Sequence, residues 1–350
     1  MDSRIGAAVL GGTGTVGQQF VSLLARHPWF RLDAVVASER SAGKRYAEAT
    51  RWLLGDSIPE EARDLPVLPL GAHLDAPIVF SALPTEVAGE MEESYARRGH
   101  AVFSNAGNHR MDPLVPLLVP EVNPEHSELV PAQRRQKGWS GFIATNPNCS
   151  AAVLVLALHP LQQAFGLRRV LVTTLQAISG AGYPGVPSLD ILDNVIPYIG
   201  NEEHKLQTEP LKMLGVYRDG QIEPAPFAIS AHCNRVATRD GHLECVSVEL
   251  VAEVSSAEIA AVLAAYRSLP QELGLPTAPT RPIVVRSEPD RPQTRLDRDA
   301  GNGMTVSVGR IRACPILGHK LVALGSNTMR GAAGGSMLNA ELFKARGLLG

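Results

Sequence analysis

Short apolar runs alternate with helix-like patterns through the first third of the chain. The apolar run at 4–10 leads directly into a glycine-rich turn. After the turn, apolar residues recur at the spacing of one helical face, at Val16, Phe20, Leu23 and Leu24. Further apolar runs at 32–38, 77–83 and 100–105 predict strands, with a helix between the last two. Such alternation through short connections is typical of a doubly wound parallel sheet.

The second half of the chain has a different pattern. Its strand candidates lie at 168–178, 243–254, 282–287 and 304–314. They are longer, apolar and polar residues alternate in them, and long segments separate them, which is typical of an α+β domain with a mainly antiparallel sheet. Ser255 and Glu258 form a capping-box pattern that predicts a helix through Tyr266.

Composition and charge exclude some classes of partner. The 350 residues are 45% hydrophobic and 19% charged, which is enough to bury a large core, and the length suggests two domains. A net charge of −2 provides no field for a polyanion, so nucleic acid is not an expected partner. No apolar run reaches the roughly 18 residues that cross a bilayer, and no basic leader precedes the first strand. We therefore expect a cytoplasmic protein without a membrane partner.

The four cysteines are too few and too scattered for a disulfide framework, and none belongs to a C-x-x-C pair. A metal site would use His232, Cys233, His242 and Cys245. Their spacing matches no familiar zinc pattern, so we expect no metal.

The glycine-rich turn points to a nucleotide. Gly12, Gly14 and Gly17 fit the G-x-G-x-x-G pattern between a predicted strand and a predicted helix. Glycines let the backbone approach a pyrophosphate, which the helix amino terminus attracts. The alternative is a glycine turn that only packs a helix on a sheet.

The end of the second strand bears on the choice of cofactor. Ser38, Arg40, Ser41 and Lys44 cluster there and suit the 2′-phosphate of NADP. Glu39 is the contrary signal, because an acid at this place binds the ribose of NAD. We favour NADP, with a solvated charged loop as the alternative. Ser81 lies at the carboxyl end of another strand, where ligands gather in such sheets.

Cys149 occupies a position suited to nucleophilic catalysis. Asn148 is a good N-cap residue, and the apolar run from there to Leu161 predicts a buried helix. Cys149 then lies in the first turn, where backbone N–H groups and the helix dipole stabilise a thiolate. The alternative is a small cysteine that packs the start of a helix.

Two polar segments carry further candidates. Glu202 and Lys205 are three residues apart, so both can point to one side of a helical turn, although a surface pair is the alternative. Arg235 offers a planar fork for a carboxylate, and His242 titrates near neutrality, as a proton-transferring group should. A structural histidine in a loop is the alternative for His242.

Six ordered motifs resemble those of the aspartate-β-semialdehyde dehydrogenase family: GGTGTVG, NPNCS, LQAISGAGYPG, IPYIGNEEHK, CNRV followed by DGH, and SNTMRGAAGG. The resemblance covers essentially the whole chain, and the segment 179–199 is similar to that of the fungal and archaeal branch of the family. It implies an NADP-binding Rossmann domain at 1–148 and an α+β catalytic and dimerisation domain at 149–325. A C-terminal helix within 326–350 would pack back on the Rossmann domain, and the assembly would be a homodimer or homotetramer.

The resemblance also implies a reaction. It is the reversible, NADPH-dependent reductive dephosphorylation of L-aspartyl-4-phosphate to L-aspartate 4-semialdehyde, with release of phosphate, on the route to lysine, threonine and methionine. Cys149 matches the nucleophile that forms a thioester, and His242 matches the acid/base group, acting as an imidazolium. Gln176 matches the glutamine that orients the acyl intermediate.

Substrate and cofactor positions follow from the same motifs. Arg235 would bind the substrate carboxylate and Glu202 its amine. The phosphate ligands would be Asn105, Arg110 and Lys205. The residues expected at the cofactor are Gly12, Thr13, Gly14, Thr15, Val16 and Gly17 at the pyrophosphate, Ser38, Arg40 and Ser41 at the 2′-phosphate, Ser179, Gly180 and Asn327 near the nicotinamide, and Ser81 at its strand end.

Three other functions would use some of the same residues. Archaeal malonyl-CoA reductases look similar, but Arg110 and Lys205 favour an acyl phosphate over an acyl-CoA. N-acetyl-glutamyl-phosphate reductase is disfavoured by the E-x-x-K and DGH motifs. A non-catalytic NADP-binding redox sensor that uses Cys149 would need neither His242 nor Arg235.

Overall fold

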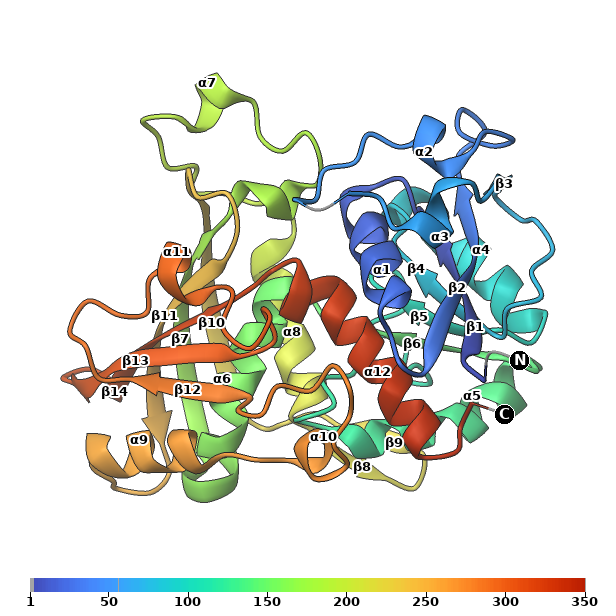
Figure 1. The fold of residues 1–350 in the computed structure, drawn as a ribbon. Coiled ribbons are helices and arrows are strands. Elements are labelled where there is room, and N and C mark those ends of the chain that lie inside the picture. Colours follow the sequence, from blue (N-terminus) through green and yellow to red (C-terminus); the bar gives the residue numbers. More distant parts are fainter. Residues whose placement is uncertain (1–2, 56, 350) are drawn as a thin grey trace.

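The computed structural model describes residues 3–55 and 57–349, which fold around two six-stranded sheets (Figure 1). A small hairpin of β8 (Val216–Arg218) and β9 (Gln221–Glu223) is separate from both. No helix in these ranges has the length and apolar character that crossing a bilayer requires.

The first sheet is parallel throughout and has the order β3-β2-β1-β4-β5-β6. Its strands are β1 (Ile5–Leu10), β2 (Phe30–Ala37), β3 (Val67–Pro69), β4 (Ile78–Ser81), β5 (Ala101–Ser104) and β6 (Phe142–Thr145). The helical segments of this half are α1 (Thr15–Ala25), α2 (Tyr46–Ala49), α3 (Glu60–Arg63), α4 (Thr85–Arg97), η1 (Pro124–Leu129) and α5 (Val130–Lys137). The strand order reverses between β1 and β4, and ligands bind at such a switch point in doubly wound sheets. The predicted parallel sheet is confirmed.

Apolar side chains cover both faces of this sheet. One face packs against α1 and α12 (Gly334–Ala345), with Phe20, Met337 and Phe343 in a single cluster. The other face packs against α4, through Ala88 and Tyr95. Figure 1 shows the red α12 beside the blue α1. A helix from the far end of the sequence therefore completes the core of the first sheet.

The second sheet is mixed, in the order β10-β7-β11-β14-β13-β12. Its three central pairings are antiparallel, and the two outer pairings, β10 with β7 and β12 with β13, are parallel. The strands are β7 (Leu167–Gln176), β10 (Ala228–Arg235), β11 (His242–Leu250), β12 (Ile283–Arg286), β13 (Val306–Cys314) and β14 (Gly318–Gly325). The helical segments are α6 (Cys149–Phe165), η2 (Ile178–Ala181), α7 (Ser188–Ile191), α8 (Glu202–Met213), α9 (Ser256–Ala265), α10 (Leu269–Glu272), α11 (Thr294–Asp297) and η3 (Met329–Ala333).

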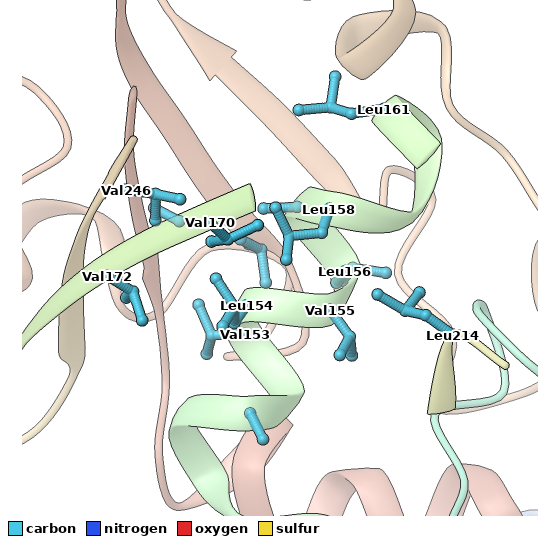
Figure 2. Packing of buried hydrophobic residues seen from close by; sticks show 14 of the residues in the cluster. Val153, Leu154, Val155, Leu156, Leu158, Leu161, Val170, Val172, Leu214 and Val246 are labelled. Atoms are coloured by element: carbon cyan, nitrogen blue, oxygen red, sulfur yellow. The ribbon is translucent and has the colours of Figure 1, made fainter. Parts of the chain in front are cut away.

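Helix α6 runs through the core of this half. Its side chains from 150 to 158 are completely or almost completely buried, because the helix lies between the sheet and helices α8 and α9. Val170 and Val172 of β7 and Val246 of β11 pack in the same cluster (Figure 2). Asn148 caps the helix, and its side chain accepts the N–H groups of Ser150 and Ala151. The first residue of α6, Cys149, is thus held by a rigid, buried support.

Strands β10 and β14 and helix α5 do not appear in the sequence-based expectation. In sequence β10 looks like a polar segment, because its outward positions carry polar or exposed side chains. The polar stretch at 124–138 is largely helical. There the buried side-chain amide of Gln133 donates to the carbonyl of Ile143 and accepts its backbone N–H. These two hydrogen bonds attach α5 to β6. The capping box of Ser255 and Glu258 is confirmed.

Candidate active site

A cavity of about 1000 Å³ opens between the two halves of the chain. Residues predicted for catalysis, substrate and cofactor line it together: Thr15, Val16, Asn105, Arg110, Cys149, Gln176, Ser179, Gly180, Glu202, Lys205, Arg235 and Asn327. The fold therefore joins the start of α1, the loop after β5, the start of α6, the loop after β7 and one face of α8 around a single space.

Cys149 and His242 meet at this cavity. The Sγ atom of Cys149 lies 3.1 Å from Nε2 of His242. His242 begins β11 and is completely buried, so it sits behind the cavity wall and not in its open part. Gly180 covers the ring, and a Cβ atom on Gly180 would come within 3.3 Å of Nε2. Nε2 therefore lies between the sulfur and the backbone of Gly180.

The surroundings of His242 fix the position of its ring proton. Nδ1 accepts the backbone N–H of Ala177 at 3.1 Å, because a backbone N–H can only donate. The neutral ring then carries its proton on Nε2, which faces the sulfur. Burial, followed by the charge of Arg235, lowers the pKa of His242 to about 3. In the unliganded cavity burial therefore favours the neutral ring, with its N–H directed at the sulfur.

The Cys149 thiol is protonated in the unliganded cavity. Desolvation and then the charge of Glu202 raise its pKa to about 12, against the lowering effects of Arg110 and Arg235. The N-terminal position on α6 therefore does not by itself make a thiolate. A cation that neutralised Glu202 would remove one of the two main obstacles to ionisation.

Glu202→Gln is expected to make Cys149 more reactive towards iodoacetamide. Removal of the negative charge lowers the thiol pKa, so at any pH below that value the thiolate fraction rises, by about threefold to tenfold. Site-resolved mass spectrometry of Cys149 alkylation between pH 7 and pH 9 measures this. Glu203→Gln, on the same helix, is the matched control and should leave the rate unchanged. Slower alkylation in Glu202→Gln would contradict the assigned effect of this carboxylate.

The backbone of Ala177 connects two further candidates. Its carbonyl accepts Nη1 of Arg235 at 2.7 Å, while its N–H holds His242 as described. Arg235 and Gln176 are paired residues of the parallel strands β10 and β7, which brings both side chains to the same end of the sheet. Gln176 is almost completely buried and donates to the hydroxyl of Thr174 at 3.3 Å.

Asn327 ties the C-terminal motif to the site. Its side chain donates to Oγ of Ser179 at 2.8 Å and accepts the N–H of Gly241, the residue before His242, at 2.8 Å. Gly331, four residues later, was not predicted. A Cβ atom there would lie 2.5 Å from Cβ of Cys149, so only glycine allows η3 to pack this closely against the cysteine.

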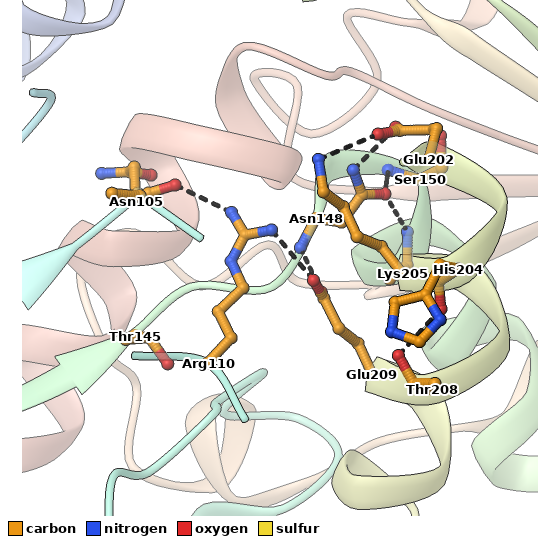
Figure 3. A network of polar contacts seen from close by, with 12 residues as sticks. Asn105, Arg110, Thr145, Asn148, Ser150, Glu202, His204, Lys205, Thr208 and Glu209 are labelled. Atoms are coloured by element: carbon orange, nitrogen blue, oxygen red, sulfur yellow. Dashed lines mark hydrogen bonds and ion pairs between the residues drawn. The ribbon is translucent and has the colours of Figure 1, made fainter. Parts of the chain in front are cut away.

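A polar network surrounds the start of α6 (Figure 3). Glu202 accepts Nδ2 of Asn148 at 2.7 Å and pairs with Lys205 at 3.4 Å. Arg110 is nearly buried and donates to the carbonyl of Asn105 at 2.8 Å and to the carboxylate of Glu209 at 3.0 Å. Glu209 was not among the predicted residues. In sequence it looks like any charged position of a helix, and only the fold brings it into the cavity.

The cavity reaches the start of α1, where the glycine motif lies. A Cβ atom on Gly17 would come within 2.2 Å of the Gly11 carbonyl, so Gly17 permits close packing of helix and strand. Gly14 is the N-cap and provides no side-chain cap, which leaves the first-turn N–H groups to an outside acceptor. These features fit a bound pyrophosphate.

Some predicted cofactor residues lie outside the cavity. Ser38 and Arg40 are exposed and Ser41 is half-buried on the turn after β2, with no hydrogen bond or ion pair from Arg40 among the described residues. Ser81 is completely buried and does not line the cavity. Four residues of the turn before α1 and of the start of that helix lie beside the cavity without lining it, namely Gly12, Thr13, Gly14 and Gly17. Across 3–55 and 57–349, no three His, Cys, Asp or Glu residues form a group that could hold a metal ion.

Two family models match the chain. The model described as "Semialdehyde dehydrogenase, NAD binding domain" matches residues 6–130. The model described as "Semialdehyde dehydrogenase, dimerisation domain" matches residues 158–330. Together they cover the second sheet and all strands of the first sheet except β6.

Full-length relatives carry one common name. The chain is 54% identical over 341 residues to the aspartate-semialdehyde dehydrogenase of Archaeoglobus fulgidus, with 97% of this chain and 98% of the relative covered. It is 45% identical over 359 residues to that of Saccharomyces cerevisiae, with 98% of each chain covered.

Solved structures agree with these relatives. The crystal structure of aspartate semialdehyde dehydrogenase with NADP from Candida albicans has a TM-score of 0.91 and 44% identity, and the match covers 99% of this chain and 100% of that one. Aspartate semialdehyde dehydrogenase II complexed with ASA from Vibrio cholerae has a TM-score of 0.77 and 26% identity, with 98% of each chain covered.

Proposed function

Because the chain belongs to the aspartate-semialdehyde dehydrogenase family, we propose that it interconverts L-aspartyl-4-phosphate and L-aspartate 4-semialdehyde with NADP(H) and phosphate. The observation that carries this proposal is the contact of 3.1 Å between Sγ of Cys149 and Nε2 of His242 at a cavity that also contains Arg110, Lys205 and Arg235. A nucleophilic thiol, a fixed N–H donor and cations for two anionic groups are the parts that an acyl phosphate requires.

The substrate is oriented by charges at three places. Arg235, held at the end of β10, pairs with the α-carboxylate as a planar fork. Glu202 accepts the substrate ammonium group, which neutralises the carboxylate that raises the thiol pKa. Arg110, Lys205 and Asn105 bind the phosphate. Substrate binding thereby promotes ionisation of the same sulfur that attacks it.

Cys149 and His242 share the chemical steps. The sulfur attacks the acyl carbon, the C–O bond to phosphate breaks, and the leaving phosphate carries away the thiol proton as hydrogen phosphate. When bound, the nicotinamide would supply the hydride that the thioester carbon accepts. Nε2–H of His242 donates a hydrogen bond to the developing oxyanion and then to the departing thiolate. Gln176 holds the acyl group in place. Collapse of the tetrahedral intermediate releases the aldehyde and the thiolate, and a proton from water restores the thiol.

The same proposal assigns the cofactor site. The turn of Thr13 and Gly14 and the first residues of α1, Thr15 and Val16, would bind the pyrophosphate. Ser38, Arg40 and Ser41 would bind the 2′-phosphate of NADP, and the exposure of Ser38 and Arg40 on the turn after β2 supports this. Ser179, Gly180 and Asn327 would lie at the nicotinamide. Ser81 contributes its backbone at most, because its side chain is buried.

The proposed domain division places a cofactor domain at 1–148, a catalytic and dimerisation domain at 149–325 and a C-terminal helix within 326–350. The packing of α12 in the core of the first sheet supports the last part, whereas Leu117, Val119 and Val122 pack in the core cluster of the second sheet. We propose a homodimer built on the second domain. The match to a dimerisation-domain model supports it.

Purified protein is expected to reduce NADP when aspartate semialdehyde and phosphate are both present. Without phosphate the reaction should stop at the thioester, so NADPH absorbance should not rise beyond about one turnover per site. A clear preference for NAD in the same assay would contradict the role of Arg40. Activity with malonyl-CoA and none with the semialdehyde would instead identify an acyl-CoA reductase. A protein that binds NADP but is silent with both substrates would be the redox sensor.

A further inference from the structure

Helix α8 carries two acid–lysine pairs. Glu202 and Lys205 form the first pair, and Glu209 and Lys212 form the second, seven residues further along. Seven residues are nearly two helical turns, so all four side chains lie along one face of the helix. The first pair is part of the proposed substrate site. The second pair has no part in the steps above, although both of its members are almost completely buried.

Glu209 connects the loop after β5 with the start of α6. Oε1 accepts Nη1 of Arg110 at 3.0 Å, and Oε2 accepts the backbone N–H of Asn148 at 2.6 Å. Asn148 precedes the cysteine, and Arg110 is the proposed phosphate ligand. Figure 3 shows the carboxylate between the Arg110 guanidinium and the chain at Asn148. One carboxylate thus sets the spacing between the phosphate cation and the start of the nucleophile helix.

The side chain of Lys212 binds the backbone of the same loop. Its Nζ donates to the carbonyls of Arg110, Asp112 and Val115 at 2.7, 2.8 and 2.9 Å, so all three of its protons are used. The loop after β5 is therefore fixed by α8 at the Arg110 side chain and at its backbone. A carboxylate is required at 209 because each of its oxygens accepts from a different donor, whereas an amide has only one accepting oxygen.

We propose that Glu209 is a positioning residue for the phosphate subsite: it holds Arg110 at the distance from Cys149 at which an acyl phosphate can be attacked. This inference rests on the proposed function. A purely structural ion pair would affect phosphate and cofactor binding alike. If Glu209 positions Arg110, its loss weakens phosphate binding and leaves cofactor binding unchanged.

Glu209→Gln is expected to raise the KM for phosphate about tenfold or more, with the KM for NADP unchanged within about twofold. A second measurement needs no turnover: the phosphate concentration that halves alkylation of Cys149 should rise by a similar factor. If the wild-type protein fails the activity assay, the proposed function fails, and the alkylation titration still tests Glu209.

Glu203→Gln is the matched control. Glu203 lies on the same helix, accepts the N–H of Cys233 at 3.1 Å and does not line the cavity, so both phosphate measurements should match the wild type. Should Glu209→Gln fail to fold, Glu209→Asp keeps the charge beside Arg110 but is one methylene too short to reach both donors, and the same result is expected.

A double-mutant cycle completes the test. In an Arg110→Ala background, Glu209→Gln should change phosphate binding by less than about twofold, because the group that it positions is gone. A full additional loss in that background would overturn the proposal. An unchanged phosphate KM in the single variant, or an equal loss for phosphate and NADP, would overturn it as well.

Discussion

Cys149→Ala is expected to abolish phosphate-dependent reduction of NADP, with a loss in kcat of about 10⁴-fold or more. The variant lacks the atom that forms the covalent bond, and the neighbouring hydroxyl of Ser150 is buried and does not line the cavity. NADPH absorbance with aspartate semialdehyde and phosphate measures the loss. NADP binding, followed by fluorescence or calorimetry, should be unchanged.

Cys245→Ala is the control for this experiment. Cys245 is an exposed thiol on β11, and its removal should leave kcat within about twofold of the wild type. Residual activity of Cys149→Ala above about one per cent would show that the thioester route is not the main route.

His242→Ala is expected to lower kcat by about 10² to 10⁴-fold, because the oxyanion and the departing thiolate lose their N–H donor. The pH profile separates the two possible roles of the histidine. With its pKa lowered to about 3 in the unliganded protein, His242 keeps the same neutral form from pH 8 down to pH 5, so it produces no acid limb in kcat/KM, which reports the free enzyme. An imidazolium would titrate within that range.

The pH profile can contradict this assignment directly. An acid or alkaline limb near pH 6.5 that is present in the wild type and absent in the histidine variant would show that His242 changes protonation during turnover. Thermal unfolding of both proteins under the assay conditions controls for loss of the fold, since the completely buried ring also fills space in the core.

The sequence predicts the elements of this site better than the bonds between them. A polar N-cap before an apolar helix places Cys149 correctly at the start of α6, and the strand–turn–helix setting identifies the glycine turn. The tautomer of His242 could not be predicted, because it depends on the backbone N–H of Ala177, which no side-chain pattern reveals. Glu209 was missed for a similar reason. Helical spacing shows which face it shares, but not that a loop of the other domain covers that face.

Strand ends were the other weak point. Ser81 was expected at the ligand because β4 ends there, but successive side chains of a strand point to opposite faces, and the buried pattern of this short strand is the same at every position. Sequence alternation therefore gives no orientation there. β10 differs from β4, because exposed and buried side chains alternate along much of it. This alternation follows from its place at the edge of the sheet beside β7.

The packing of α12 has a consequence for how the protein is made. Met337, Ala340 and Phe343 belong to the same apolar cluster as the first strands, so the core of the cofactor domain is assembled from both ends of the chain. On the ribosome the strands of the parallel sheet emerge before the helix that closes their core. The thiol at the start of α6 is synthesised in between, so the cofactor half beside it is complete only after α12 has been made and has docked.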